Sequence, residues 1–158
     1  MRRIAFLTDI HLHEAFPLGK KVTPEKNLEV IMADLWKKGI QEIVFGGDIG
    51  ESSAHPYFFQ RINNYPLKVI LGNHDCFKTV SDYFNKSDKR DELYYQEEDE
   101  HFKYLFLDSS SDTISDSQLE WLRVELETIK KVILFIHHPV IEIDTPADKL
   151  FPLKTGYC

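Results

Sequence analysis

The chain has 158 residues, a length that suits one domain with a buried hydrophobic core, and we expect a single domain over residues 1–158. Its 42% hydrophobic and 28% charged residues are typical of a soluble globular protein, and it contains no apolar run of membrane-spanning length. The formal net charge of −7 disfavours unspecific attraction to nucleic acid or to an anionic membrane surface.

The beginning of the chain and its cysteines bear on the compartment. The start MRRIAFLTD reaches Asp9 too soon for a signal peptide. The two cysteines, Cys76 and Cys158, lie far apart in the chain, which argues against a disulfide framework. We therefore expect Cys76 to be a small buried thiol and the protein to be cytoplasmic.

The first half alternates short apolar segments with amphipathic ones. Residues 3–8, 42–46 and 67–72 are rich in β-branched and aromatic residues and are bounded by turn residues, as strands buried on both faces tend to be. A helix lies between the first two strands, and a weaker helix over 55–64 precedes the third. This βαβαβ order predicts a parallel sheet with right-handed crossovers.

Capping signals mark the first helix. Thr23 is expected to cap it, Pro24 suits its first position and Gly39 ends it. One apolar stripe runs along its length, formed by Leu28, Ile31, Met32 and Leu35.

The second half of the chain has a different order of predicted elements. Strands over 92–97 and 102–108, joined by a charged turn, predict an antiparallel hairpin. A helix over 116–129 and a strand over 131–136 follow, and residues 144–158 read as a loop that contains proline. The helix begins with a capping box formed by Ser115 and Gln118. Its apolar face is formed by Leu119, Leu122, Leu126 and Ile129.

Polar side chains follow four of the predicted strands. They are Asp9 and His11, Asp48, the run Asn73, His74 and Asp75, and the pair His137 and His138. Catalytic groups of parallel sheets gather at the carboxyl ends of the strands. Mixed carboxylate and imidazole donors suit Mn, Fe, Zn or similar divalent ions. Two such ions about 3.5–4 Å apart hold a hydroxide and clamp phosphoryl oxygens.

Each of these short motifs is also common in ordinary turns, so their concurrence carries the prediction of a metal site. In this interpretation the amide of Asn73 binds a metal and the imidazole of His74 meets a phosphate ester. His13 is expected to be a solvated loop residue, and His138 to point away from the site because successive residues leaving a strand face opposite ways. His55 and His101 are expected at the surface.

Four motifs carry a resemblance to a known family. DIH at 9–11, GGDI at 46–49, GNHD at 72–75 and HHP at 137–139 resemble, in order, the signature blocks of the calcineurin-like metallophosphoesterase superfamily. The likeness is greatest to its small bacterial branch near the class III cyclic nucleotide phosphodiesterases, and it extends over about residues 3–140. It implies a four-layer α/β/β/α sandwich with a dinuclear metal centre.

The resemblance also implies roles for individual residues. Asp9 and His11 would hold the first metal, Asn73 and His137 the second, and Asp48 would bridge the two. His74 would contact the phosphate as a catalytic residue, with Asp75 orienting it. The implied reaction is hydrolysis of phosphomonoesters or phosphodiesters by a metal-bound hydroxide, with a small phosphate ester as substrate.

The sequence departs from the family pattern at one point. The family ends its site with a Gly-His-x-His block after the His-Pro strand, and this sequence contains none. We therefore expect a C-terminally incomplete domain with a homodimer formed through the exposed edge of the second sheet. The alternative is a truncated metal-binding remnant with little or no turnover. A nuclease is a further alternative, against which the acidic balance and the lack of a Lys/Arg cluster argue.

Overall fold

The computed structural model describes residues 3–14, 22–84, 86 and 91–140. The predicted tail loop over 144–158 lies outside these residues. In the described part of the chain, six strands form two three-stranded sheets, one from each half of the chain. No helix there is both long and apolar enough to cross a membrane.

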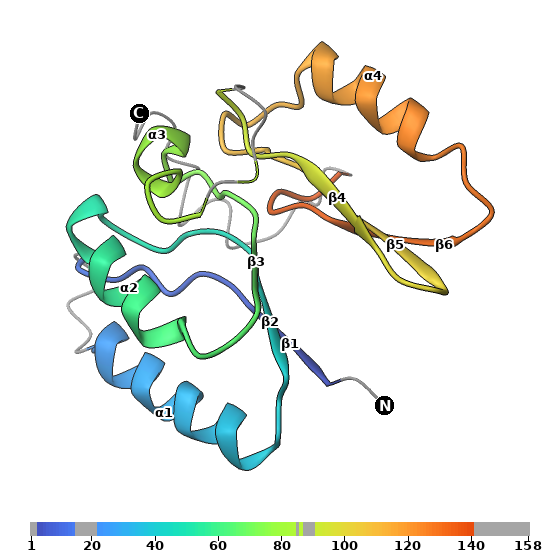
Figure 1. The fold of residues 1–158 in the computed structure, drawn as a ribbon. Coiled ribbons are helices and arrows are strands. Elements are labelled where there is room, and N and C mark those ends of the chain that lie inside the picture. The colour runs from blue at the N-terminus through green and yellow to red at the C-terminus, as the bar shows by residue number, and fades with distance from the viewer. Residues whose placement is uncertain (1–2, 15–21, 85, 87–90, 141–158) are drawn as a thin grey trace.

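The first sheet is parallel, as predicted. β1 (Ile4–Leu7), β2 (Glu42–Phe45) and β3 (Leu67–Val69) lie side by side in that order. All four residues of the central strand β2 are buried, as expected for a strand whose two faces are both covered. Helices α1 (Pro24–Lys37) and α2 (His55–Ile62) lie together on one face of this sheet (Figure 1).

Helix α1 follows its predicted pattern except at the cap. Pro24 stands at its start, and Leu28, Met32 and Leu35 face the core. The side chain of Thr23 makes no capping hydrogen bond; instead the Thr23 carbonyl accepts from the amide of Asn27 at 3.0 Å. The cap prediction was therefore wrong in its chemistry although right about where the helix begins.

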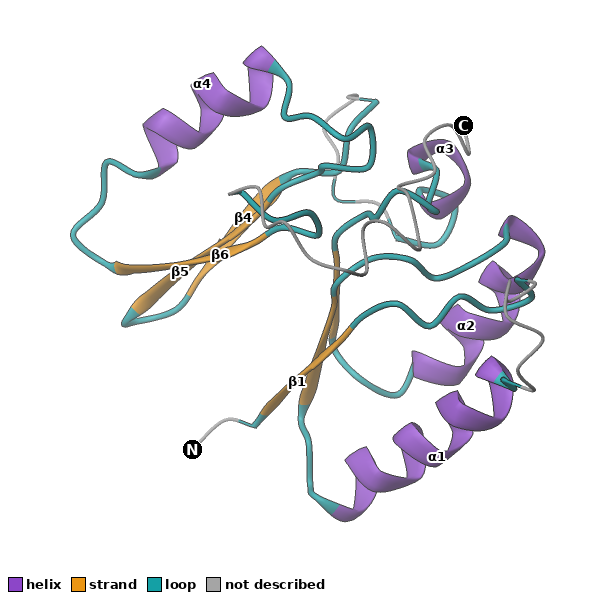
Figure 2. Ribbon diagram, turned by 180° about the vertical axis from the view of Figure 1, so that it is seen from behind, coloured by secondary structure: helices purple, strands orange, loops and turns teal. Residues whose placement is uncertain are grey.

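The second sheet is mixed. β4 (Tyr95–Glu98) and β5 (Phe102–Phe106) form the predicted antiparallel hairpin, and β6 (Lys131–Phe135) pairs in parallel with β5. The connection from β5 to β6 contains α4 (Asp116–Glu125), which lies on the outer side of this sheet (Figure 2). Two short helical segments also lie among the described residues, η1 (Ser52–Ala54) and α3 (Phe77–Val80).

Helix α4 confirms its predicted cap and corrects two other expectations. Ser115 caps the helix, because its hydroxyl accepts from the amide of Gln118 at 3.2 Å. The helix ends at Glu125 instead of residue 129, and its predicted apolar face is largely exposed, with Leu119 at 42% and Leu126 at 50%. The hydrophobic period therefore located the helix but not a buried face.

The two sheets pack against each other. The ring of Phe135 stacks on that of Phe106 at 5.0 Å and lies 6.0 Å from that of Phe6 in the other sheet. The hydroxyl of Tyr95 in β4 accepts from the amide of Val69 in β3 at 3.0 Å and donates to its carbonyl at 2.9 Å. The layers are thus α1 with α2, the first sheet, the second sheet, and α4, the predicted α/β/β/α sandwich (Figures 1 and 2).

Two single-residue expectations fail. Cys76 is half-buried and disulfide-bonded in the structure, so the prediction of a reduced buried thiol was wrong. His55 is 1% exposed instead of lying at the surface, because it begins α2 with its ring edge-on to those of Phe59 and Tyr83.

Candidate metal centre

The loops that follow β1 and β2 run side by side and carry the first group of site residues. The amide of Asp9 donates to the carbonyl of Gly47 at 3.0 Å, and the amide of His11 donates to the carbonyl of Asp48 at 3.1 Å. Asp9, His11 and Asp48 all have positive φ angles, of 58°, 51° and 61°. Left-handed backbone of this kind is uncommon outside glycine and gathers at functional sites.

The side chain of Asp48 lies between two imidazoles. Its Oδ2 is 3.5 Å from Nε2 of His11 and 3.6 Å from Nε2 of His137. Nδ1 of His137 donates to the carbonyl of Gly46 at 2.7 Å, which turns Nε2 of that ring toward Asp48. Asp9 closes the group, with Oδ1 3.7 Å from Nε2 of His11. Three strand ends thus direct their side chains toward one point.

Glycine at position 72 permits this close approach. A Cβ atom there would lie 2.1 Å from Oδ1 of Asp48 and 2.8 Å from Cε1 of His137. Gly47 is equally confined: a Cβ atom on it would lie 2.5 Å from the amide nitrogen of Gly72. Any larger residue at either position would displace the backbone or the site side chains.

Asp75 connects these loops through hydrogen bonds to their backbone amides. Its carboxylate accepts from three backbone amides, those of Asp48 at 2.7 Å, Ile49 at 3.0 Å and Gly72 at 3.0 Å. Asp75 is 3% exposed, and burial raises its pKa to about 7 against the lowering effect of the amides. The contacts of this carboxylate therefore hold the Asp48 loop, whereas the sequence had predicted that Asp75 orients His74.

The backbone of the GNHD segment also contacts Asp48. The amide of His74 donates to Oδ1 of Asp48 at 3.0 Å, and Asn73, just before it, is 6% exposed. The ring of His74 meets Glu14, whose carboxylate lies 2.9 Å from Nδ1. Sequence reasoning missed Glu14. The available signal was an acidic residue three positions after His11, continuing the polar run of DIHLHE.

The charges of the site favour a bound cation. Burial works against the charged form of His11, but the carboxylates of Asp9, Glu14 and Asp48 outweigh it and raise the pKa of that imidazole to about 10. The adjacent His11 lowers the pKa of Asp9 to about 2, with further lowering by Thr8 and His137 and opposition from burial. An imidazole whose proton is held this firmly marks a position where negative charge is in excess.

The donor set fits divalent metal ions. Asp9, Asp48 and His137 offer ligand atoms that all lie within 4.8 Å of one another, and His11, Glu14 and His74 form a second such group. Carboxylate oxygen with imidazole nitrogen is the combination that Mn, Fe and Zn accept, and the raised pKa of His11 shows that positive charge is stabilised here.

The remaining histidines lie apart from this group. The ring of His13 contacts the hydroxyl of Ser53 at 3.0 Å and its side chain is 40% exposed. His138 turns to the other side, with Nδ1 2.9 Å from the hydroxyl of Ser109 and Nε2 3.4 Å from Asp112. The predicted difference in direction between His137 and His138 is thereby confirmed.

Comparison with protein families agrees with this architecture. The family model for calcineurin-like phosphoesterases matches residues 2–153, nearly the whole chain. The chain belongs to the calcineurin-like phosphoesterase family. Membership confirms the resemblance that the four short motifs had carried.

Two curated relatives of this phosphoesterase family member carry phosphodiesterase names. A probable cyclic nucleotide phosphodiesterase of Fibrobacter succinogenes is 29% identical over 145 residues, covering 87% of this chain and 57% of that protein. A probable glycerophosphodiester phosphodiesterase of Arcobacter nitrofigilis is 32% identical over 116 residues, covering 64% of this chain and 42% of that protein. The chain therefore spans about half the length of these relatives.

Solved structures share the fold. A dimetal phosphatase from Danio rerio superposes with a TM-score of 0.65 at 13% identity, covering 87% of this chain and 70% of that one. A purple acid phosphatase from yellow lupin (Lupinus luteus) seeds gives a TM-score of 0.58 at 16% identity, covering 84% of this chain and 29% of that one. At these identities the likeness establishes the metallophosphoesterase fold.

Proposed function

We propose that this protein is a metal-dependent phosphoesterase that hydrolyses small phosphodiesters or phosphomonoesters at a dinuclear centre. The observation that carries the proposal is the position of Asp48, whose Oδ2 lies between Nε2 of His11 and Nε2 of His137 at 3.5 and 3.6 Å. A carboxylate between two imidazoles is placed to serve two cations at once. The names of the curated relatives favour diesters as the preferred class.

The proposed roles follow from this placement. Asp9 and His11 would hold one cation, Asn73 and His137 the other, and Asp48 both. Two divalent ions in such a site lower the pKa of a water that can act as nucleophile and neutralise the charge of the phosphoryl oxygens. Gly72 leaves the room in which the ligands approach one another.

His74 is proposed to act on the substrate. Its amide is held by Oδ1 of Asp48 at 3.0 Å, so that its ring is anchored next to the ligands. From there an imidazole can donate a proton to a phosphoryl oxygen or to the leaving oxygen, a contribution of about 10²–10⁴ in rate.

The test uses the 158-residue protein, stripped with chelator and reloaded with Mn²⁺. We expect hydrolysis of bis(p-nitrophenyl) phosphate to depend on the metal. Asp48→Asn should lower bound Mn²⁺ and abolish turnover, whereas His74→Ala should keep the metal and lose only turnover. Asp34→Asn is the control, because Asp34 is an exposed residue paired with Lys38. Equal Mn²⁺ content in wild type and Asp48→Asn would refute the ligand assignment, and a metal-loaded wild type that hydrolyses neither a monoester nor a diester would refute the activity.

A further inference from the structure

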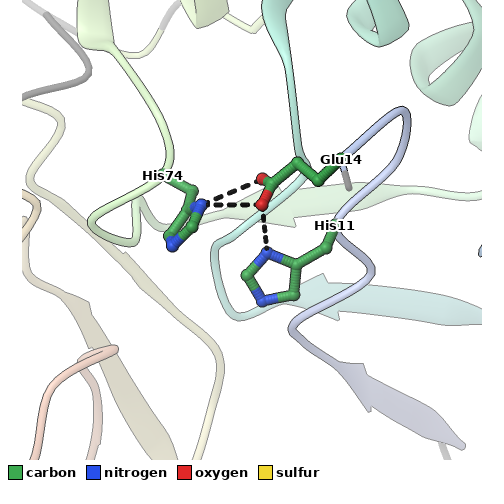
Figure 3. Close-up of side chains that lie close together, drawn as sticks. All are labelled: His11, Glu14 and His74. Carbon is green, nitrogen blue, oxygen red and sulfur yellow. Dashed lines mark hydrogen bonds and ion pairs between the residues drawn. The ribbon is translucent and has the colours of Figure 1, made fainter. Parts of the chain in front are cut away.

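Glu14 joins two histidines to which the proposed reaction gives different tasks. Its Oε2 is 3.2 Å from Nδ1 of His11 and 2.9 Å from Nδ1 of His74, and its Oε1 is also 2.9 Å from the latter. Figure 3 shows the carboxylate between the two rings. The two rings stand edge to face with their centroids 4.7 Å apart.

This contact is screened from solvent. The side chains of Glu14 and His74 are each 15% exposed, and that of His11 is 20% exposed. In partly buried surroundings a hydrogen bond to a carboxylate is both stronger and more directional than at an open surface. The arrangement therefore restricts how either ring can turn.

The carboxylate also requires hydrogen on the ring nitrogen that faces it. An ionised carboxylate only accepts hydrogen bonds, so both rings must present Nδ1–H to Glu14. Nε2 of His11 then faces Asp9 and Asp48, at 3.7 and 3.5 Å, as a metal ligand would. For His74 the bond from Nδ1–H to Glu14 leaves Nε2 as the nitrogen that can face a phosphate oxygen, to which it donates when the ring carries hydrogen on both nitrogens.

We infer that Glu14 is a positioning residue that fixes the orientation of both His11 and His74 and keeps hydrogen on Nδ1 of each ring, and so couples the metal site to the phosphate contact. The inference rests on the proposed function. Carboxylates in this position behind a metal-binding histidine typically change metal affinity or activity about 10–100-fold when they are removed. Here one carboxylate would act on a ligand and on a substrate-facing group together.

The test compares Glu14→Gln with Glu25→Gln. Glutamine keeps the size of the side chain, but it can accept from only one ring through its carbonyl and presents an amide donor to the other. Glu25 is a matched control, because it also stands near a histidine, 4.0 Å from Nε2 of His13, but is 42% exposed and outside the site. Calorimetry would measure Mn²⁺ stoichiometry, Mn²⁺ affinity and the affinity of the Mn²⁺-loaded protein for orthophosphate.

For Glu14→Gln we expect unchanged Mn²⁺ stoichiometry, Mn²⁺ affinity about tenfold weaker and orthophosphate affinity about 10–100-fold weaker, with Glu25→Gln like wild type. In a His74→Ala background, Glu14→Gln should have little further effect on orthophosphate affinity. Long-range ¹H–¹⁵N spectra of the Zn²⁺-loaded wild type should show hydrogen on Nδ1 of His74, and Glu14→Gln should lose this signature.

Three results would overturn the inference. Loss of one metal equivalent in Glu14→Gln would make Glu14 a ligand, since its group could itself hold an ion. Unchanged orthophosphate affinity would remove the positioning role toward His74 and with it the coupling, and a full effect in the His74→Ala background would show that Glu14 does not act through His74. These readouts need no turnover. A wild type that binds Mn²⁺ and orthophosphate but hydrolyses no ester would refute the proposed function without refuting the position of Glu14.

Discussion

Replacing Asp75 by asparagine should loosen the loops that carry Asp48 and Gly72. The carboxylate of Asp75 holds three amides: Oδ2 accepts from those of Asp48 and Gly72, and Oδ1 accepts from that of Ile49. Asparagine has one acceptor oxygen in place of two. Its NH₂ group must therefore face at least one of these amides, donor against donor.

The size of the effect follows from these contacts. Losing one hydrogen bond to a charged acceptor costs about 1.5–3 kcal/mol, and a buried donor left without a partner costs about 1–3 kcal/mol. Asparagine also relieves the burial of a charge, whose unfavourable effect is visible in the raised pKa of Asp75. Since this relief offsets part of the loss, we expect Asp75→Asn to lower the free energy of unfolding by about 1–3 kcal/mol.

The assay is urea unfolding in chelator at pH 8, above the pKa of about 7 that burial gives Asp75, together with Mn²⁺ titration of each variant. Mn²⁺ affinity should fall with stability, because the amide of Asp48 loses its anchor. Asp34→Asn, which removes an exposed carboxylate, should change stability by less than about 1 kcal/mol. If Asp75→Asn unfolds like wild type and binds Mn²⁺ equally well, but loses orthophosphate affinity as His74→Ala does, then Asp75 orients His74 and the reasoning from its amide contacts is wrong.

Three further predictions concern other parts of the molecule. Gly72→Ala should weaken Mn²⁺ binding in titrations and cost about 1–3 kcal/mol of stability, because its Cβ would lie 2.1 Å from Oδ1 of Asp48. Burial, the leading cause, lowers the pKa of His55, so folding stability should be fully present above pH 6.5 and fall as pH drops toward the lowered pKa of the folded state. The contribution of His55 to this slope can be at most about 1.4 kcal/mol per pH unit, and it should be absent in His55→Phe. We also propose that the protein self-associates through β6, the last strand in the described sheet order, where Val132, Ile133 and Leu134 are 36–41% exposed; light scattering should show a homodimer that Leu134→Lys dissociates.

Each of these three can fail on its own. Wild-type Mn²⁺ affinity in Gly72→Ala would mean that the backbone moves away at no cost to the ligands. Parallel pH profiles of wild type and His55→Phe would mean that His55 binds a proton equally well in the folded and the unfolded chain. A monomeric wild type would mean that the edge of β6 is no interface between copies.

The strands and their order were predictable because their signals are local and agree with one another. Residues 43–45 are apolar, the segment 42–46 is bounded by turn residues, and β2 is indeed buried on both faces. Strand ends were less predictable. The segment 67–72 was expected to be strand throughout, yet β3 ends at Val69, because the next residues turn toward the site, where Gly72 packs against Asp48.

The convergence of the proposed ligands was predictable for a topological reason, and the residues that contact them were not. Carboxyl ends of neighbouring parallel strands meet at one edge of the sheet, so Asp9, His11 and Asp48 had to come together once the strands were known. Glu14 and Asp75 act through contacts whose partners depend on the course of a loop. The burial of His55 likewise depends on which rings surround it, and a single polar residue at a helix start gives no sign of that.

The balance of charge at the site links its two proposed tasks. Asp9 and Asp48 direct carboxylate oxygens at the point where His11 and His137 meet, so these side chains without a metal present negative charge to any molecule that approaches. A phosphate ester is itself an anion and would be repelled there. Only a site carrying bound divalent cations can invert that charge and attract the substrate. Phosphate affinity should therefore depend on metal occupancy, and in the proposed role of Glu14, which contacts both His11 and His74, this carboxylate would link the two events.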